Sequence, residues 1–338
     1  MKKYKINIII LIIISFIVMY FALKDDFNTT IKYLATVNLL WIGVGILAFV
    51  LYLIFQSLSL HIFMKGIDKN YKLKDTILLI LSAQFFNAIT PFSSGGQPFQ
   101  MYLMKKQGIK LTDSGNVLLQ NFIGQQLSII IMGTFSIVIN KVFNIIPQDN
   151  MLRKIVVIGY VVNIVVLLIL FMLSYAKKTN TELFNKILNF IFKFKFIRNK
   201  NDLKEKLLNK IDEFYEGSAY FKKNISKLLR ATLYNVIGLV FYYIIPLFVF
   251  FSIGEVSSIT ILESIVCSGY TYLIGSFVPI PGGTGGLEYG FIQFFQGFTV
   301  GATLSACMIL WRFITYYFGM IIGAISLLFY KRREEKWE

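Results

Sequence analysis

The fold of this chain is decided by two short segments, Pro91-Phe92-Ser93-Ser94-Gly95-Gly96 and Pro281-Gly282-Gly283-Thr284-Gly285-Gly286. Both read Pro-x-x-x-Gly-Gly, they lie about 190 residues apart, and each interrupts an apolar stretch of membrane length. Proline removes a backbone donor and glycine adopts conformations closed to other residues, so each segment predicts a break between two helices. Paired breaks of this kind in two halves of a membrane chain point to the binding site of a transporter.

The composition is that of an integral membrane protein. The chain has 338 residues, of which 56% are hydrophobic, 16% aromatic and only 15% charged, whereas soluble domains have about a quarter charged residues. A net charge of +16 would suggest a nucleic-acid partner in a soluble protein. Here the basic residues gather in loops on one side, as cytoplasmic loops of membrane proteins do, so we expect no nucleic acid.

Apolar segments long enough to cross a bilayer are expected at 6–23, 39–64, 117–139, 155–175, 231–252 and 302–330. The two broken stretches cover 76–104 and 260–298. The first segment resembles a signal peptide, but its apolar run is longer than a signal requires and no small-x-small site precedes Lys24. We therefore expect an uncleaved first helix.

Loop charge predicts the orientation. Basic residues at 2–5, 65–74 and 105–110 place the N-terminus and both ends of the first broken stretch in the cytoplasm. The basic region 177–230 and the C-terminal 331–333 also lie inside, which leaves the second broken stretch to enter from outside. Both termini are then cytoplasmic, and the protein is expected in the bacterial cytoplasmic (inner) membrane.

These patterns predict an all-α polytopic membrane protein built as two inverted-topology repeats, with about six full transmembrane helices and two re-entrant broken-helix hairpins. We expect a single domain over 1–338, with repeats at 1–140 and 154–330. The insertion 177–230 carries Leu203, Leu207, Ile211 and Phe214 at helical spacing. It is either an amphipathic segment on an anionic leaflet or an ordinary basic loop. Gly/Pro breaks also occur as packing devices in membrane helices.

Among the ionisable residues inside the membrane-length segments, two stand out. Glu288 begins the half-helix after Gly285-Gly286, and Arg312 lies well within the last span. Charges in hydrocarbon are costly and are functional-site candidates for that reason. We expect the two side chains to pair near the membrane centre, although Glu288 can also serve only to compensate the dipole of its helix.

The second break suits an anion. A helix that starts inside the membrane presents free N–H groups and a partial positive charge, and glycine lets a ligand approach its backbone. With an arginine added, such a site fits a phospholipid headgroup. The predicted headgroup site comprises Arg312, Glu288, Gly282, Gly283, Gly285, Gly286, Ser93, Ser94, Gly95, Gly96 and Gln97, with Pro91, Pro279 and Pro281 as hinges. Ser94 to Gln97 also matches a capping box.

Further polar residues are candidates for lining a cavity. Asn121, Gln125 and Ser128 recur at i, i+4 and i+7 and must face protein or water, so they line the cavity or bond neighbouring helices. Glu263, at the outer end of the second broken stretch, and Tyr316, one turn after Arg312, are two more candidates. No spacing among Cys267, Cys307 and His61 indicates a disulfide or metal site, so no cofactor is expected.

Thr90-Pro91, Gly95-Gly96-Gln97-Pro98 and the run from Pro279 to Glu288 resemble motifs of the lysylphosphatidylglycerol synthase transmembrane-region family. That family includes the flippase portion of the bacterial multiple peptide resistance factor and many stand-alone proteins. The resemblance implies lipid translocation, with aminoacylated phosphatidylglycerol such as lysyl-phosphatidylglycerol as the best-known cargo, and a role in antimicrobial peptide resistance. In the full-length factor a soluble domain makes this lipid. The sequence stops at Glu338, directly after its last span, so we expect that domain to be missing and the chain not to be an enzyme itself.

The leading hypothesis is a lipid flippase whose partners are membrane phospholipids, anionic or aminoacylated. Two alternatives stay open: a membrane subunit that presents lipid to an aminoacyl- or glycosyl-transferase, and a secondary transporter of a small solute or ion. A separate soluble transferase and a second copy of the chain, in a homodimer, are left open as partners.

Overall fold

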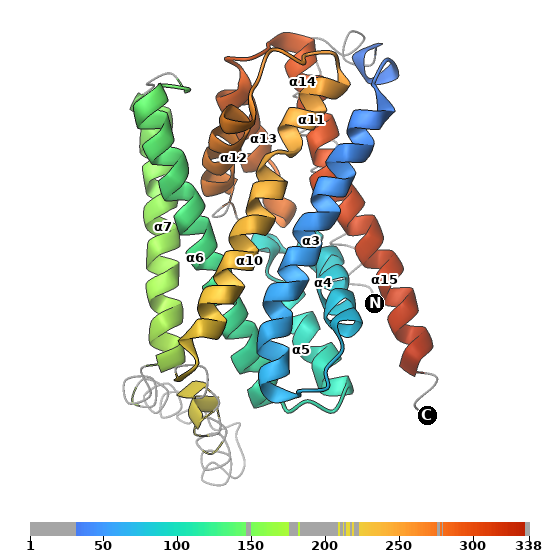
Figure 1. Ribbon diagram of the computed structural model, residues 1–338, viewed down its shortest axis with the longest axis vertical. Helices are drawn as coiled ribbons and strands as arrows, with labels where there is room; N and C mark the ends of the chain where they lie inside the picture. The colour runs from blue at the N-terminus through green and yellow to red at the C-terminus, as the bar shows by residue number, and fades with distance from the viewer. Residues whose placement is uncertain are drawn as a thin grey trace, which may run out of the picture.

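The computed structural model describes residues 32–146, 150–175, 223–275, 278 and 280–334, with a few further positions between 182 and 219. Every regular element in these ranges is a helix, and they contain no strand (Figure 1). The predicted all-α polytopic fold class is therefore confirmed. The expected first span, 6–23, and the hinge Pro279 lie outside the described residues.

Five long apolar helices in the described part are able to cross a membrane. They are α3 (Leu39–Ile67), α6 (Leu111–Phe143), α7 (Asn150–Tyr175), α10 (Ile225–Tyr243) continued by α11 (Ile245–Ser252), and α14 (Gly301–Arg312) continued by a π-helical turn, η3 (Phe313–Tyr317), and α15 (Phe318–Glu334).

Two expected spans are interrupted. The fifth, predicted as one helix over 231–252, changes at Ile244, because Pro246 at the start of α11 lacks the N–H that a continuous helix needs. The last span, predicted over 302–330, contains the π-helical turn η3 directly after Arg312. The sequence predicted the lengths of these spans but not their internal breaks.

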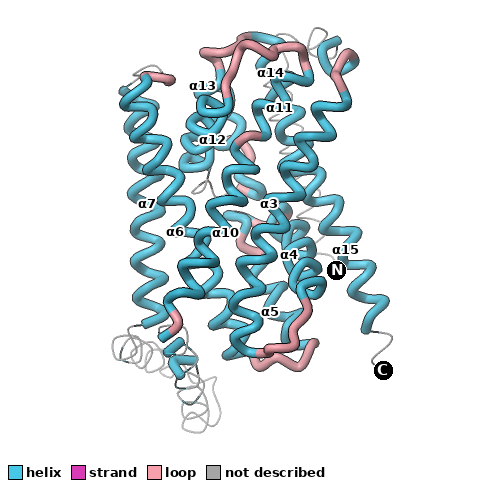
Figure 2. The backbone as a smooth tube through the Cα atoms, in the orientation of Figure 1, coloured by secondary structure: helices cyan, strands magenta, loops and turns pink. Residues whose placement is uncertain are grey.

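Two shorter helix pairs fill the broken stretches. In the first, α4 (Leu73–Ala88) and α5 (Gly96–Lys106) flank a 3₁₀ turn, η1 (Pro91–Ser93). In the second, α12 (Ile261–Gly275) and α13 (Gly286–Phe295) flank η2 (Pro281–Gly283). The two pairs occupy opposite ends of the bundle, and η1 and η2 meet in its interior (Figure 1). Both predicted helix breaks are therefore present, and Figure 2 shows loop segments inside the bundle as well as at its ends.

The two turns share a left-handed backbone at their second and third residues. Phe92 and Ser93 have φ values of 53° and 51°, and the matching Gly282 and Gly283 have 64° and 65°. This left-handed region costs about 1–2 kcal/mol for a residue that is not glycine. The turns differ after these residues, since Ser94 is helical and Thr284 is not. The first half therefore adopts with side chains the left-handed step that the second half makes with glycine.

The hydrogen bonds that close the two turns also match. The hydroxyl of Ser94 donates to the carbonyl of Pro91 at 2.8 Å, and the hydroxyl of Thr284 donates to the carbonyl of Pro281 at 2.8 Å. In each turn the same carbonyl also accepts the backbone N–H of that residue, at 3.2 Å in the first turn and 3.3 Å in the second. The likeness between the halves thus extends from the sequence motif to individual atoms.

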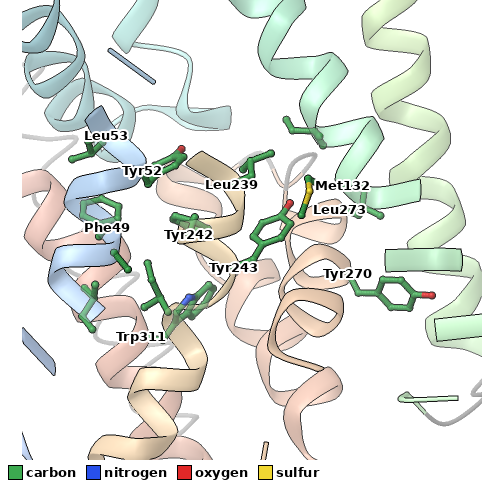
Figure 3. Close-up of a cluster of buried hydrophobic side chains, with 14 of the residues drawn as sticks. Phe49, Tyr52, Leu53, Met132, Leu239, Tyr242, Tyr243, Tyr270, Leu273 and Trp311 are labelled. Carbon is green, nitrogen blue, oxygen red and sulfur yellow. The ribbon is translucent and has the colours of Figure 1, made fainter. Parts of the chain in front are cut away.

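The helices pack through large aromatic side chains where α3 crosses α10. The rings of Tyr52 and Tyr242 lie 4.9 Å apart, and Tyr243 beside them is almost fully buried (Figure 3). Phe49 of α3 also contacts Tyr242. Aromatic pairs of this kind add to the packing energy beyond their buried area, so they fix α3 against the second half.

Part of the insertion 177–230 packs against protein. The hydroxyl of Ser218, which is buried, donates to the side-chain oxygen of Asn116 on α6, and the Asn116 amide donates to the carbonyl of Phe214 at 2.8 Å. The ring of Phe214 lies beside Gly115. These contacts attach Phe214 and Ser218 to the start of α6, and both alternatives for the insertion, an amphipathic segment on a leaflet and an ordinary basic loop, stay predictions.

Candidate functional site

Arg312, the last residue of α14, is held inside the bundle by three contacts. Its Nε lies 2.7 Å from Oε1 of Glu288, and its Nη2 donates to the carbonyl of Gly282 at 3.2 Å and to the hydroxyl of Thr284 at 3.3 Å. The exposed fraction of Arg312 is 5%. The predicted pair of Arg312 and Glu288 is therefore present, and the arginine is bound to the turn η2 as well.

Glu288 has two tasks. One carboxylate oxygen meets Arg312, and the other accepts the backbone N–H of Gly285 at 2.7 Å, which caps α13. Ion pairing and compensation of the helix dipole were predicted as alternatives, and the structure has the ion pair with the carboxylate also at the start of α13. Since Glu288 is only 8% exposed, removing either partner of the pair leaves a buried charge, at a cost of about 3–5 kcal/mol.

Tyr316 connects Arg312 to the first half. Its ring centre lies 4.5 Å from the guanidinium carbon of Arg312, and its hydroxyl donates to the carbonyl of Ala88, at the end of α4, at 3.1 Å. A Cβ placed on Gly282 would come within 2.1 Å of this ring, so the turn requires glycine there. The π-helical turn η3 contains Tyr316, and such turns are frequent at functional sites.

A cavity of about 330 Å³ lies between the two turns and is lined by residues from both halves. Arg312 lines it, and among the described residues its Nη1 has no hydrogen-bond partner. Glu288 does not line the cavity and lies behind the arginine. The guanidinium is therefore fixed from behind and keeps donors available to a ligand.

The predicted site residues divide into two groups. Those that line the cavity are Ser93, Gly96, Gln97, Asn121, Gln125, Gly282, Gly283, Arg312 and Tyr316. Those that do not are Pro91, Ser94, Gly95, Glu263, Pro281, Gly285, Gly286 and Glu288. The second group shapes the turns or caps helices: the carboxylate of Glu263, for example, accepts the backbone N–H and the hydroxyl of Thr260 at the start of α12.

The first turn is capped by residues that the sequence reasoning missed. The N–H of Gly95 donates to the hydroxyl of Thr90 at 2.8 Å, and the N–H of Gly96 donates to the side-chain oxygen of Asn87 at 2.9 Å. The predicted capping box of Ser94 and Gln97 is wrong, because the left-handed turn directs the Ser94 hydroxyl to Pro91. Both capping residues lie before the Pro-x-x-x-Gly-Gly motif, whereas the usual capping patterns place the capping side chain directly at the helix start.

The side of the cavity formed by α6 and α10 is lined by amide side chains. Asn121 and Gln125 were predicted, whereas Asn235 of α10 was missed. The amide of Asn235 donates to the hydroxyl of Ser59 at 2.9 Å, and this hydroxyl donates to Asn121 at 2.9 Å, so one chain of bonds links α10, α3 and α6. Other amides that line the cavity are Gln56, Gln84, Gln97, Gln100 and Gln126.

Comparisons with known proteins agree with this architecture. The family model described as "Lysylphosphatidylglycerol synthase TM region" matches residues 8–323. A UPF0104 membrane protein of Pyrococcus horikoshii is 24% identical over 97% of each chain, and one of Methanocaldococcus jannaschii is 23% identical over 97% of this chain and 96% of its own. An uncharacterized protein of Mycoplasma pneumoniae is 20% identical over 94% of this chain and 85% of its own. The chain belongs to the lysylphosphatidylglycerol synthase transmembrane-region family.

Proposed function

We propose that this protein is a lipid flippase that carries phospholipid headgroups across the membrane. The observation that supports this most is the position of Arg312, buried between two broken helix pairs and facing a polar cavity. In hydrocarbon an arginine is retained for a task, and a cavity at the meeting point of two repeats is where transporters bind their substrates. Membership of a family named for a lipid agrees with this function.

The chemistry of the turn favours a phosphate group. Arginine binds phosphate through parallel N–H donors, and the ion pair with Glu288 prevents its side chain from swinging away. Helix ends of both signs meet at the turns, because α5 and α13 begin there and α4 and α12 end there, with Ala88 and Gly275 in the cavity lining. Arg312 is therefore the group that would stabilise a phosphodiester.

The size of the cavity suits the headgroup of a lipid but not its acyl tails. A volume of about 330 Å³ is near the lower limit of small-molecule sites, roughly 300–1,000 Å³, and has room for a headgroup but not for two acyl chains. The tails would remain in the bilayer while the headgroup crosses. This division avoids placing the headgroup's charge in hydrocarbon, which is the main barrier to unassisted flipping.

The two similar halves provide a mechanism for alternating access. We propose that both helix pairs are re-entrant, α4–α5 from the cytoplasm and α12–α13 from outside, with cytoplasmic termini in a bacterial cytoplasmic membrane. The hydrogen bond from Tyr316 to Ala88 joins the halves at the turns. When this bond breaks, Arg312 would face one surface of the membrane. When the two halves exchange their conformations and a corresponding contact forms, Arg312 would face the other surface.

The function is tested by reconstitution. The purified protein is placed in liposomes with a trace of fluorescent phosphatidylglycerol, and dithionite is added to quench the outer leaflet. We expect the protected inner-leaflet signal to disappear with protein and to persist in empty vesicles, while a trapped soluble dye stays protected in both. A persistent protected signal with folded protein would overturn the proposal.

A further inference from the structure

The two halves share a turn but differ in charge around it. Counting about 190 residues back from Arg312 leads to Phe122 on α6, whose neighbours Asn121 and Gln125 line the cavity. The second half thus contributes a guanidinium, whereas the first half contributes neutral amides at the equivalent place. This difference between the parts of the cavity that the two halves contribute suggests a ligand with two chemically different ends.

Two buried acceptors at the amide end have no partner among the described residues. They are Oε1 of Gln126 and Oδ1 of Asn235, and both side chains line the cavity. Asn235 is only 3% exposed and Gln126 is 8% exposed. An unpaired buried acceptor costs about 1–3 kcal/mol, so a rotation of either amide toward a ligand that brings a hydrogen-bond donor would be favourable.

We propose that this end of the cavity, defined by Asn121, Gln125, Gln126 and Asn235, binds an uncharged, hydroxyl-bearing part of the headgroup while Arg312 binds its phosphate. The chemical class is a polyol phosphodiester, with glycerol or a sugar beyond the phosphate. The inference rests on the proposed function and narrows its substrate. A protein with this headgroup preference differs in specificity from a carrier of aminoacylated lipid.

Hydroxyl groups fit this end better than an ammonium does. An amide has an acceptor and two donors, so its natural partner both donates and accepts, which a hydroxyl does and an ammonium does not. A desolvated ammonium also needs a carboxylate nearby. In the part of the lining that the structure describes there is none, and Glu288 behind it is already bound to Arg312 and Gly285.

The first test compares headgroups on the wild-type protein. Fluorescent phosphatidylglycerol and phosphatidylinositol represent the two polyol sources, and phosphatidylethanolamine and lysyl-phosphatidylglycerol carry an ammonium. We expect at least one polyol lipid to cross roughly tenfold faster than both ammonium lipids, the effect of about one unpaired buried polar group. Equal rates, or faster transport of either ammonium lipid, would overturn the proposal.

The second test changes the site. Gln125→Glu places a carboxylate on the cavity wall, and Gln296→Glu adds the same charge at an exposed position of the loop after α13. Gln125→Glu should slow the polyol lipid and speed phosphatidylethanolamine, whereas Gln296→Glu should match the wild type. An unchanged preference in Gln125→Glu would contradict the assignment of this end.

A binding measurement separates this inference from the proposed function. Thermal stability of the detergent-solubilised protein is measured with glycerol 1-phosphate, phosphoethanolamine and inorganic phosphate. Stabilisation by glycerol 1-phosphate above the other two supports the polyol site even if no lipid moves, in which case only the flippase proposal falls. Equal or greater stabilisation by phosphoethanolamine overturns the polyol site even if lipids do move.

Discussion

Arg312 and Glu288 form a buried ion pair, with Nε and Oε1 2.7 Å apart, yet only the arginine reaches the cavity. The carboxylate lies behind it and also caps α13 through Gly285. Under the proposed function the two residues have different tasks: Arg312 contacts the substrate, and Glu288 fixes the direction of the guanidinium. Both are needed, but for reasons that separate measurements can distinguish.

The ion pair predicts a split between stability and transport. Arg312→Leu or Glu288→Leu alone leaves one buried charge and should lower the free energy of unfolding by about 3–5 kcal/mol. The double variant Arg312→Leu/Glu288→Leu removes both charges and should regain much of that loss, while transport stays abolished. Thermal denaturation in detergent and dithionite quenching measure the two quantities. Transport that returns with stability in the double variant would show a purely structural role.

The matching left-handed positions predict opposite effects of opposite exchanges. Ser93→Gly relieves the strain of a side chain at φ 51° and should stabilise the protein by about 1 kcal/mol after the added chain entropy of glycine. Gly283→Ser introduces that strain at φ 65° and places a Cβ 3.0 Å from Leu287, so it should destabilise the protein. Melting temperatures that move in the same direction for both variants would contradict the equivalence of the turns.

The hydrogen bond between Tyr316 and Ala88 predicts how easily the halves separate. Tyr316→Phe removes the donor but keeps the ring beside Arg312, so the closed contact between the turns should lose about 1 kcal/mol. The readout is the rate at which a maleimide labels Ser128→Cys, a buried position on the cavity wall, which should rise roughly fivefold for that loss. The native Cys267 and Cys307 are buried, and a sample without the added cysteine measures their background. An unchanged rate would mean that this bond does not restrain opening.

The helix breaks and the ion pair could be predicted from the sequence. A break depends on the local backbone, and an ion pair follows from the cost of any charge in the membrane. Proline and glycine end helices wherever they stand, and a charge in hydrocarbon needs a partner. Asn235 and Gln56 could not be found this way, since a single polar residue in an apolar helix carries no sign of which neighbour it faces. Their role depends on how α3 and α10 cross, which only the structure shows.

The prediction of the helix cap was wrong for a different reason. The capping box at Ser94 and Gln97 assumes an ordinary N-terminus, but two left-handed residues before Ser94 turn its hydroxyl back to Pro91. Sequence patterns for caps assume the usual approach of the chain to a helix, and an unusual approach changes which side chain reaches the free N–H groups. Thr90 and Asn87 serve them instead.

The central claim is that Arg312 binds the phosphate of a lipid that the protein carries across the membrane. The most direct measurement is the dithionite-quenching rate of fluorescent phosphatidylglycerol in proteoliposomes with Arg312→Ala, compared with wild type and with Arg153→Ala, which removes an exposed arginine of α7. Only folded protein, judged by size exclusion, is reconstituted. The account predicts rapid loss of the protected signal for wild type and Arg153→Ala and a persistent signal for Arg312→Ala. Wild-type quenching by folded Arg312→Ala would contradict it.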